Sequence, residues 1–457
     1  MQVLKQIKKP VRTISGITPL TVVAAPFPCP HGKCIYCPGS KEVPNSYTNQ
    51  SPAIMRALAF KYDVAKQIEA RLRAFAAMGH AAEKIEIIII GGTFLAMPKN
   101  YKYDFVKALY DSLNGETAND LDQAKRINEK AKHRCVAFCI ETKPDVCNKK
   151  DIDEMLNYGC TRVELGVQIP DNRIYKIINR GHTVKDVIKA TQLLKDSGYK
   201  VGYHFMPGLP GSNFNHDIKK FRELFENSNF MPDHLKIYPT VIVKNSPLEK
   251  IYKKINYVPY SDEELLELLI ELHKIVPRWC RIMRVMRQFP PSQIVSGTKR
   301  SDFRRIVELE MRKRGLKCVC IRCREVGFNE IKDKSIFIEK IEYVASNSKE
   351  IYLEATNSEE LVFGVCRLRI PFKPYRNEIT SNSLLLRELH VYGKEAIFGA
   401  KEWQHSGIGK MLLAEAEAIA KDKGFEKIVV ISGVGVRNYF RRFGYQLEGP
   451  YMVKYIN

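Results

Sequence analysis

The chain has 457 residues, of which 45% are hydrophobic and 27% are charged; these values exclude disordered and fibrous proteins and allow two or three domains. The sequence contains no apolar run long enough to span a membrane, and its basic start lacks the apolar stretch of a signal peptide. The net charge of +22 suggests a polyanionic partner.

Strand-like runs alternate with helical patterns over the first two thirds of the chain. We predict strands at 18–25, 85–90, 135–141, 161–167, 199–205 and 234–238, and helices near 52–78, 98–113, 120–131, 149–158, 183–197 and 214–227. This alternation is typical of βαβ units with a parallel sheet. We therefore expect an α/β domain over 1–265 that forms a full or partial (β/α) barrel, with its chemistry at the C-terminal ends of the strands.

Three cysteines lie close together after the first predicted strand. Cys29, Cys34 and Cys37 read C-x4-C-x2-C, and three thiolates suit a soft metal centre. A 4Fe–4S cluster normally takes four cysteines, so three leave one iron open for a small molecule. The alternative is a structural zinc knuckle, for which His31 is the only local fourth ligand. The expected place of this loop at the barrel mouth favours the cluster.

The next segment is strongly basic. A helix predicted at 261–276 opens with a capping box from Ser261 to Glu264. Residues 278–324 then hold fourteen Lys and Arg against three acidic residues, which favours contacts with nucleic-acid phosphates over a solvated surface. We interpret 266–330 as a basic linker. Its candidate phosphate contacts are Arg278, Arg281, Arg284, Arg287, Arg304 and Arg305.

A second group of cysteines lies inside this basic segment. Cys318, Cys320 and Cys323 read C-x-C-x2-C, a spacing typical of structural zinc sites, which need four ligands. His133 and His273 are candidates for the fourth ligand, and we favour His133. The alternative is three reduced surface thiols. The scatter of the other cysteines argues against a disulfide framework and for a reducing compartment, so we expect a cytoplasmic protein.

The last third shows a different order of elements. We predict strands at 335–345, 350–355, 361–370 and 384–392, a helix at 406–423, a strand at 427–431, a short helix at 436–442 and a strand near 451–456. This is an α+β pattern and indicates a separate domain over 331–457. The segment from Gln404 to Lys410 reads Q-x-x-G-x-G-K and opens the helix, where backbone amides can bind phosphate.

Two superfamilies share these motifs. The three-cysteine loop resembles that of the radical S-adenosylmethionine (SAM) superfamily, which implies that SAM contacts the turn of Gly91, Gly92 and Thr93, together with Glu141 and Gln168. The glycine-rich turn resembles the pyrophosphate loop of the GCN5-related N-acetyltransferases (GNAT). This second resemblance implies that acetyl-CoA contacts Lys84, Glu388, Leu389, His390, Val391, Gln404, Gly407, Ile408, Gly409, Lys410, Tyr439 and Phe440.

The combination resembles the family of Elongator catalytic subunits nearly end to end. The matching strings include CPHGKCIYCPG (29–39), DHLKIYPT (233–240) and RELHVYG (387–393). The resemblance implies an acyltransferase in which a SAM-derived 5′-deoxyadenosyl radical and acetyl-CoA add a carboxymethyl group to C5 of the wobble uridine of tRNA. It implies catalytic roles for Lys84, Glu388 and Tyr439, and binding of the anticodon stem-loop by a monomer or homo-oligomer.

The sequence departs from this family at two positions, where Phe440 replaces a tyrosine and Lys143 replaces an arginine. Two other functions remain open at this point. One is a protein lysine acetyltransferase in which Glu388 acts as the base and the cluster is structural. The other is a tRNA-binding scaffold without catalysis, which would tolerate loss of Cys29, Cys34 and Cys37.

Overall fold

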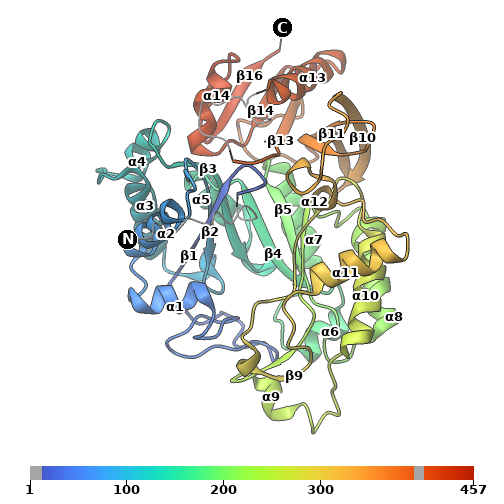
Figure 1. The fold of residues 1–457 in the computed structure, drawn as a ribbon. Helices are drawn as coiled ribbons and strands as arrows, with labels where there is room; N and C mark the ends of the chain where they lie inside the picture. Colours follow the sequence, from blue (N-terminus) through green and yellow to red (C-terminus); the bar gives the residue numbers. More distant parts are fainter. Residues whose placement is uncertain (1–12, 396–405, 457) are drawn as a thin grey trace, which may run out of the picture.

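The computed structural model describes residues 13–395 and 406–456 (Figure 1). This part of the chain forms two seven-stranded sheets and one two-stranded sheet. None of its helices is long and apolar enough to cross a membrane.

The first sheet is parallel throughout and has the order β1-β2-β3-β4-β5-β6-β8. Its strands are β1 (Thr18–Val23), β2 (Lys84–Ile90), β3 (Arg134–Thr142), β4 (Arg162–Gln168), β5 (Lys200–Phe205), β6 (His234–Ile237) and β8 (Arg281–Val285). Since β1 and β8 are the two ends of this order, the sheet is an open barrel. The prediction of a partial (β/α) barrel is therefore confirmed.

Helices connect these strands as expected for βαβ units. They are α1 (Pro52–Ala59), α2 (Val64–Ala77), α3 (Lys99–Asn114), α4 (Leu121–Asn128), α5 (Lys149–Asn157), α6 (Asn172–Ile177), α7 (Val184–Asp196), α8 (Phe214–Glu226) and α10 (Asp262–Ile275). The single helix expected at 52–78 is two helices, because Lys61 and Tyr62 have left-handed backbone conformations and the Asp63 side chain caps α2. The capping box from Ser261 to Glu264 is present.

The segment interpreted as a linker is partly a barrel element. It contains β8, β9 (Ile294–Ser296), α11 (Phe303–Lys313) and α12 (Ile321–Arg324), while β7 (Ile242–Val243), which pairs with β9, and α9 (Pro247–Ile251) precede it. Strand β8 pairs with β6 and buries Ile282 and Val285. The interpretation of 266–330 as a connecting linker is corrected here: a strand rich in arginine can join the sheet because Arg281 is neutralised by an ion pair with Glu325.

The second sheet has the order β10-β11-β12-β13-β14-β16-β15 and lies at the top of Figure 1. Its elements are β10 (Phe337–Ala345), β11 (Ser348–Thr356), β12 (Val362–Arg369), β13 (Ser383–Val391), β14 (Lys427–Val430), β15 (Gln446–Glu448), β16 (Tyr451–Tyr455), α13 (Ile408–Asp422) and α14 (Arg437–Arg441). Strand β13 pairs with β14 only over 383–386 but continues to Val391 beside β12. Beyond Leu386, its other edge is thus not paired with β14.

Charged residues join the two domains. Arg387 of β13 donates hydrogen bonds to Asp233, directly before β6, at 2.5 Å and to Glu350 of β11 at 2.7 Å. Arg369 of β12 donates to Asp196, at the end of α7, at 2.8 Å. All five side chains are buried. These contacts hold the second domain against the N-terminal ends of the barrel strands.

Candidate functional site

The first of two cavities lies at the C-terminal ends of the barrel strands; we name it the cluster cavity. It has a volume of about 640 Å³. Its lining includes Cys29, Cys34 and Cys37 from the loop after β1, and Gly92, Thr93, Glu141 and Gln168 from the ends of other strands. The three cysteines and four of the five residues assigned to SAM are thus brought together.

The spacing of the three sulfurs argues against a single metal ion. The Sγ atoms of Cys29, Cys34 and Cys37 do not all lie within 4.8 Å of one another, unlike those of the compact groups found among the described residues. Around one zinc ion, with Zn–S bonds of about 2.3 Å, tetrahedral sulfurs lie about 3.8 Å apart. The wider arrangement fits a cluster of several irons.

The surroundings of Cys34 favour its thiolate, which is the form that binds metal. Burial would raise the pKa of the Cys34 thiol, but the nearby Arg180 guanidinium and His31 lower it to about 6. Nη1 of Arg180 lies 3.5 Å from Cys34 Sγ, and His31 Nε2 lies 3.2 Å from it. On its other side, His31 Nδ1 lies 2.9 Å from Lys143 Nζ.

The turn after β2 places one glycine in the cavity and one behind it. Gly92 lines the cavity, whereas Gly91 does not. Gly91 has φ +144°, and a Cβ atom there would lie 3.0 Å from Ala24 Cβ of the neighbouring chain segment, so its role is close packing against that segment. Oγ1 of Thr93 lies 3.5 Å from Cys29 Sγ.

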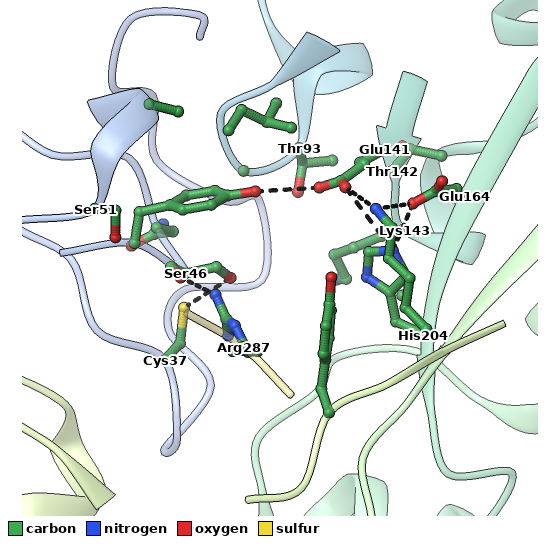
Figure 2. A pocket seen from close by; sticks show the side chains of 18 of the residues that line it. Cys37, Ser46, Ser51, Thr93, Glu141, Thr142, Lys143, Glu164, His204 and Arg287 are labelled. Atoms are coloured by element: carbon green, nitrogen blue, oxygen red, sulfur yellow. Dashed lines mark hydrogen bonds and ion pairs between the residues drawn. The ribbon is translucent and has the colours of Figure 1, made fainter. Parts of the chain in front are cut away.

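A charged layer lies in the barrel interior, and sequence analysis identified only its Glu141. Figure 2 shows Glu141, Glu164 and His204 pointing toward one another. His204 Nε2 lies 2.8 Å from Glu164 Oε2, and Lys236 forms ion pairs with both glutamates. The missed signal was the alternation along β4, β5 and β6, where Arg162 and Glu164, Lys200 and His204, and His234 and Lys236 stand an even number of residues apart and so share the inner face.

The second cavity lies between the two domains; we name it the interdomain cavity. Its volume is about 1300 Å³. The first residue of six consecutive barrel strands lines it, and each of these residues is basic: Lys84, Arg134, Arg162, Lys200, His234 and Arg281. The cavity is therefore at the N-terminal ends of the strands, opposite the cluster cavity.

The second domain contributes the other wall of the interdomain cavity. The lining residues from the acetyl-CoA set are Glu388, Leu389, His390, Val391, Gly407, Gly409, Lys410, Tyr439 and Phe440, with Lys84 from the barrel. Ile408 is instead buried in α13, and Gln404 lies outside the described residues. Gly407 has φ +92° and begins the helix, so the turn presents backbone amides to this cavity.

Tyr439 and Glu388 differ in their suitability for proton transfer. The Tyr439 hydroxyl has no hydrogen-bond partner in the described structure, and burial raises its pKa to about 12, so it stays protonated. Burial would raise the pKa of Glu388, but Lys200 at 3.0 Å and Arg367 at 2.7 Å hold it well below the usual value. Glu388 is thus an ion-paired carboxylate and a poor base.

The two cavities share part of their lining, which we name the neck. Five residues line both of them: Pro19, Ile88, Arg162, Met283 and Arg284. These residues come from β1, β2, β4 and β8 of the barrel. The two cavities therefore adjoin inside the barrel, which lies between the three-cysteine loop and the glycine-rich turn of the second domain.

The six candidate arginines do not form one surface. Arg278 pairs with Glu339, Glu354 and Glu360, Arg281 pairs with Glu325, and Arg304 pairs with Glu308 and donates to the Ile282 carbonyl. Their assignment to phosphate contacts is corrected, because these guanidinium groups are bound internally. Arg284 and Arg287 line the cluster cavity, and Arg305 is 69% exposed. Within β8, Arg281 and Arg284 are three residues apart and therefore point to opposite faces of the sheet.

The second cysteine group is compact. The sulfurs of Cys318, Cys320 and Cys323 all lie within 4.8 Å of one another, a separation that fits one tetrahedral zinc ion. His133 does not belong to this group; its Nδ1 lies 2.7 Å from the Ala82 carbonyl oxygen, which corrects its assignment as a ligand. His273 is buried beside Cys320, and its Nε2 has no hydrogen-bond partner in the described structure.

Comparisons with known proteins agree with this architecture. Residues 27–225 match the Radical SAM superfamily, 232–313 its C-terminal domain, and 322–445 the Acetyltransferase (GNAT) family. The chain is 48% identical to the tRNA uridine(34) acetyltransferase of Methanocaldococcus jannaschii over 98% of its length and 86% of that protein. It is 42% identical to Elongator complex protein 3 of Schizosaccharomyces pombe, again over 98% of this chain and 86% of that protein.

A solved structure supports the same relationship. The archaeal Methanocaldococcus infernus Elp3 with an N-terminal deletion superposes with a TM-score of 0.87 at 42% sequence identity. The match covers 97% of this chain and all of that one. Both domains and their mutual arrangement are thus common to the two proteins.

Proposed function

Because the chain belongs to the family of tRNA uridine(34) acetyltransferases and Elongator complex protein 3, we propose that it modifies the wobble uridine of tRNA. The product we propose is the 5-carboxymethyl derivative, with acetyl-CoA as the carbon source. The observation that carries this proposal is the neck, because its five residues line both the three-cysteine cavity and the acetyltransferase cavity.

The residues of the cluster cavity fit a 4Fe–4S cluster and SAM. Cys29, Cys34 and Cys37 would hold the cluster, and the wide spacing of their sulfurs supports this assignment. When bound, the cluster and SAM supply the one-electron chemistry needed to activate an unreactive methyl group. Gly92 and Gln168 line the adjacent space for SAM, and the buried Oε1 of Gln168 has no hydrogen-bond partner in the described structure.

The second domain would present acetyl-CoA to the barrel. The edge of β13 over 387–390, which is not paired with β14, can receive the pantetheine arm through backbone hydrogen bonds, and the amides around Gly409 and Lys410 can receive the pyrophosphate. We propose Tyr439 as the proton donor to the departing CoA thiolate, since its hydroxyl is protonated and the residue lines this cavity. Phe440 has no hydroxyl group for this task.

We propose a structural zinc ion on Cys318, Cys320 and Cys323, with His273 rather than His133 as the fourth ligand. The compact sulfur group and the unpartnered Nε2 of His273 support this choice. For tRNA, we propose Arg284 and Arg287 as contacts of the anticodon loop near the cluster cavity, and the exposed Arg305 as a phosphate contact. A cytoplasmic location follows from this substrate.

Protein lysine acetylation is less well supported. That reaction needs a base to deprotonate the lysine, and Glu388 is fixed between Lys200 and Arg367.

One experiment tests the proposed function. The cluster is reconstituted under anaerobic conditions, and the protein is incubated with SAM, a reductant, acetyl-CoA and tRNA. Mass spectrometry of digested tRNA should show carboxymethyluridine, and Cys29→Ala should abolish it. Absence of the modified nucleoside from iron-replete protein would refute the proposal, and acetylated lysine on a protein substrate would favour the alternative.

A further inference from the structure

The sulfur of Cys34 has two nitrogen partners, and they come from different parts of the chain. Nη1 of Arg180 donates to Cys34 Sγ at 3.5 Å, and Nε2 of His31 lies 3.2 Å from the same atom. In the described part of the chain, the hydrogen bonds of the Cys29 and Cys37 sulfurs are instead with neutral groups. These groups are the side chains of Asn45, Thr93 and Ser46 and the carbonyl of Pro38.

Arg180 is held at this sulfur by a second anchor. It is 7% exposed, and its Nη2 donates to the Gly166 carbonyl oxygen of β4 at 2.5 Å. A Cβ atom at Gly166 would lie 2.5 Å from that nitrogen, so a larger residue there would displace the guanidinium group. Since a guanidinium group is always protonated in proteins, the fold places a permanent positive charge beside Cys34.

Lys143 determines which ring nitrogen of His31 carries the proton. Lys143 is 3% exposed, and its Nζ lies 2.9 Å from His31 Nδ1 and 3.1 Å from Oδ2 of Asp145. An ammonium group has three donors and no acceptor, so Nδ1 accepts this hydrogen bond. The proton of the neutral ring is then on Nε2, and Nε2 donates to Cys34 Sγ. Lys143 therefore orients His31 as a donor to the sulfur.

The segment 178–181 packs directly against the three-cysteine loop. The Ile35 amide donates to the Ile178 carbonyl at 3.1 Å. Gly181 has φ +73°, and a Cβ atom there would overlap the side chain of His31. A glycine is therefore required at this position both for the backbone conformation and for the close approach. These contacts fix the donors of the segment and of the loop relative to each other.

We propose that Arg180, His31 and Lys143 are positioning residues that raise the reduction potential of the 4Fe–4S cluster through their contacts with and around Cys34. This inference rests on the cluster of the proposed function. Reduction adds one electron from an external one-electron donor and breaks no bond, so the negative charge of the cluster and its thiolates increases by one. Hydrogen bonds to the sulfur ligands and nearby positive charge stabilise this reduced form.

A redox titration followed by electron paramagnetic resonance tests the contribution of each residue. In the cluster-reconstituted full chain, with dithionite as reductant, His31→Leu removes the donor to Cys34. At a fixed potential, the ratio of reduced to oxidised cluster should fall about tenfold, which is a shift of the midpoint to a more negative potential. His31→Gln keeps an amide donor, so its shift should be smaller. Lys143→Met and Arg180→Met should act in the same direction as His31→Leu, because each removes a positive charge.

The matched control is Lys125→Met, which removes another buried lysine. Lys125 is 9% exposed, pairs with Asp122 and donates to the Asn157 carbonyl, and it is not among the residues that line the two cavities. This variant should keep the wild-type potential. An equal shift in the control, or unchanged potentials in His31→Leu, Lys143→Met and Arg180→Met, would overturn the inference.

Iron analysis and SAM binding separate this inference from other roles of the same residues. Loss of iron from both His31 variants would identify His31 as a metal ligand and contradict the proposal, whereas loss from His31→Leu alone would support the contact with Cys34. A weaker SAM affinity with an unchanged potential would assign the three residues to SAM binding and also overturn it. If the wild-type protein makes carboxymethyluridine but no potential shifts, only this inference fails; if it makes none, the proposed function fails, and the potentials still test the contacts.

Discussion

Lys84 shows how one buried side chain can make ligand binding depend on pH. It is the first residue of β2, lines the interdomain cavity and is only 8% exposed. Burial disfavours its ammonium form and lowers its pKa to about 8, although Glu395 and Glu83 act in the opposite direction. The charge on Lys84 is therefore lost as the pH rises through about 8.

We predict that acetyl-CoA binds less tightly at pH 9 than at pH 7, by about tenfold, because only protonated Lys84 can make a charge-assisted hydrogen bond to the ligand. Lys84→Arg keeps its charge at both pH values, so its affinity should be nearly independent of pH. Dissociation constants measured by calorimetry at both pH values check this. The same pH dependence in wild type and variant would assign the effect to another group.

Two adjacent arginines are expected to behave differently toward tRNA. Arg305 is 69% exposed, whereas Arg304 is 16% exposed and binds Glu308 and the Ile282 carbonyl. Arg305→Ala should weaken tRNA binding, reduce the slope of log K against log salt by about 1, and leave the melting temperature unchanged. Arg304→Ala should lower the melting temperature instead. Filter binding at several salt concentrations, with thermal melts, measures both effects; an unchanged slope for Arg305→Ala would remove it from the tRNA surface.

At the scale of elements, the edge of β13 and the helix α13 form a cofactor site that neither could form alone. Beyond Leu386, β13 runs without pairing to β14, and Gly407 begins α13 at the same cavity. The motif around Gly407 was readable from the sequence because the turn and the helix start are adjacent in the chain. The extension of β13 past the end of its pairing with β14 depends on the pairing of distant strands, which the sequence does not show.

The cysteine group beside α12 connects two elements of the basic segment. Cys320 directly precedes α12, and the Ile321 amide donates to the Cys280 carbonyl just before β8. We predict that Cys320→Ser loses bound zinc and lowers the melting temperature by about 5 °C or more, because a structural zinc site contributes directly to folding. Metal analysis and thermal melts measure this.

The matched control for the zinc site is Cys147→Ser, which changes another buried cysteine that does not belong to this sulfur group. This variant should keep its full zinc content even if its melting temperature falls. Full zinc occupancy in Cys320→Ser would contradict the assignment of the site.

At the scale of the whole molecule, buried ion pairs hold the two domains together. Asp233 accepts hydrogen bonds from Arg387 at 2.5 Å and from the Val201 amide at 2.8 Å, and its pKa is held well below the usual value: burial would raise it, but Arg387 and Lys195 lower it. Such pairs cost desolvation energy, so their main effect is to fix one arrangement of the domains.

We predict that Asp233→Asn destabilises the protein by about 3–5 kcal/mol, because Arg387 and Lys195 remain buried without their partner. Replacing both members, as in Asp233→Leu with Arg387→Met, should recover most of this loss. Denaturant unfolding measures both free energies. A double variant whose loss of stability equals the sum of the losses in Asp233→Leu and Arg387→Met, each measured alone, would show that the pair does not act as a unit.

The sequence by itself determined the features whose parts are neighbours in the chain: the C-x4-C-x2-C loop, the turn before α13 and the alternation of strands and helices that indicates a partial barrel. It did not determine which strand forms the last edge of the open barrel, which arginines are paired internally, or which histidine lies beside Cys320. The neck was also beyond it, since its five residues come from four different strands of the barrel. The physical reason is that local spacing sets turn geometry and strand periodicity, whereas partners far apart in sequence, such as Arg387 and Asp233 at a separation of 154 residues, meet only through the packing of the whole chain.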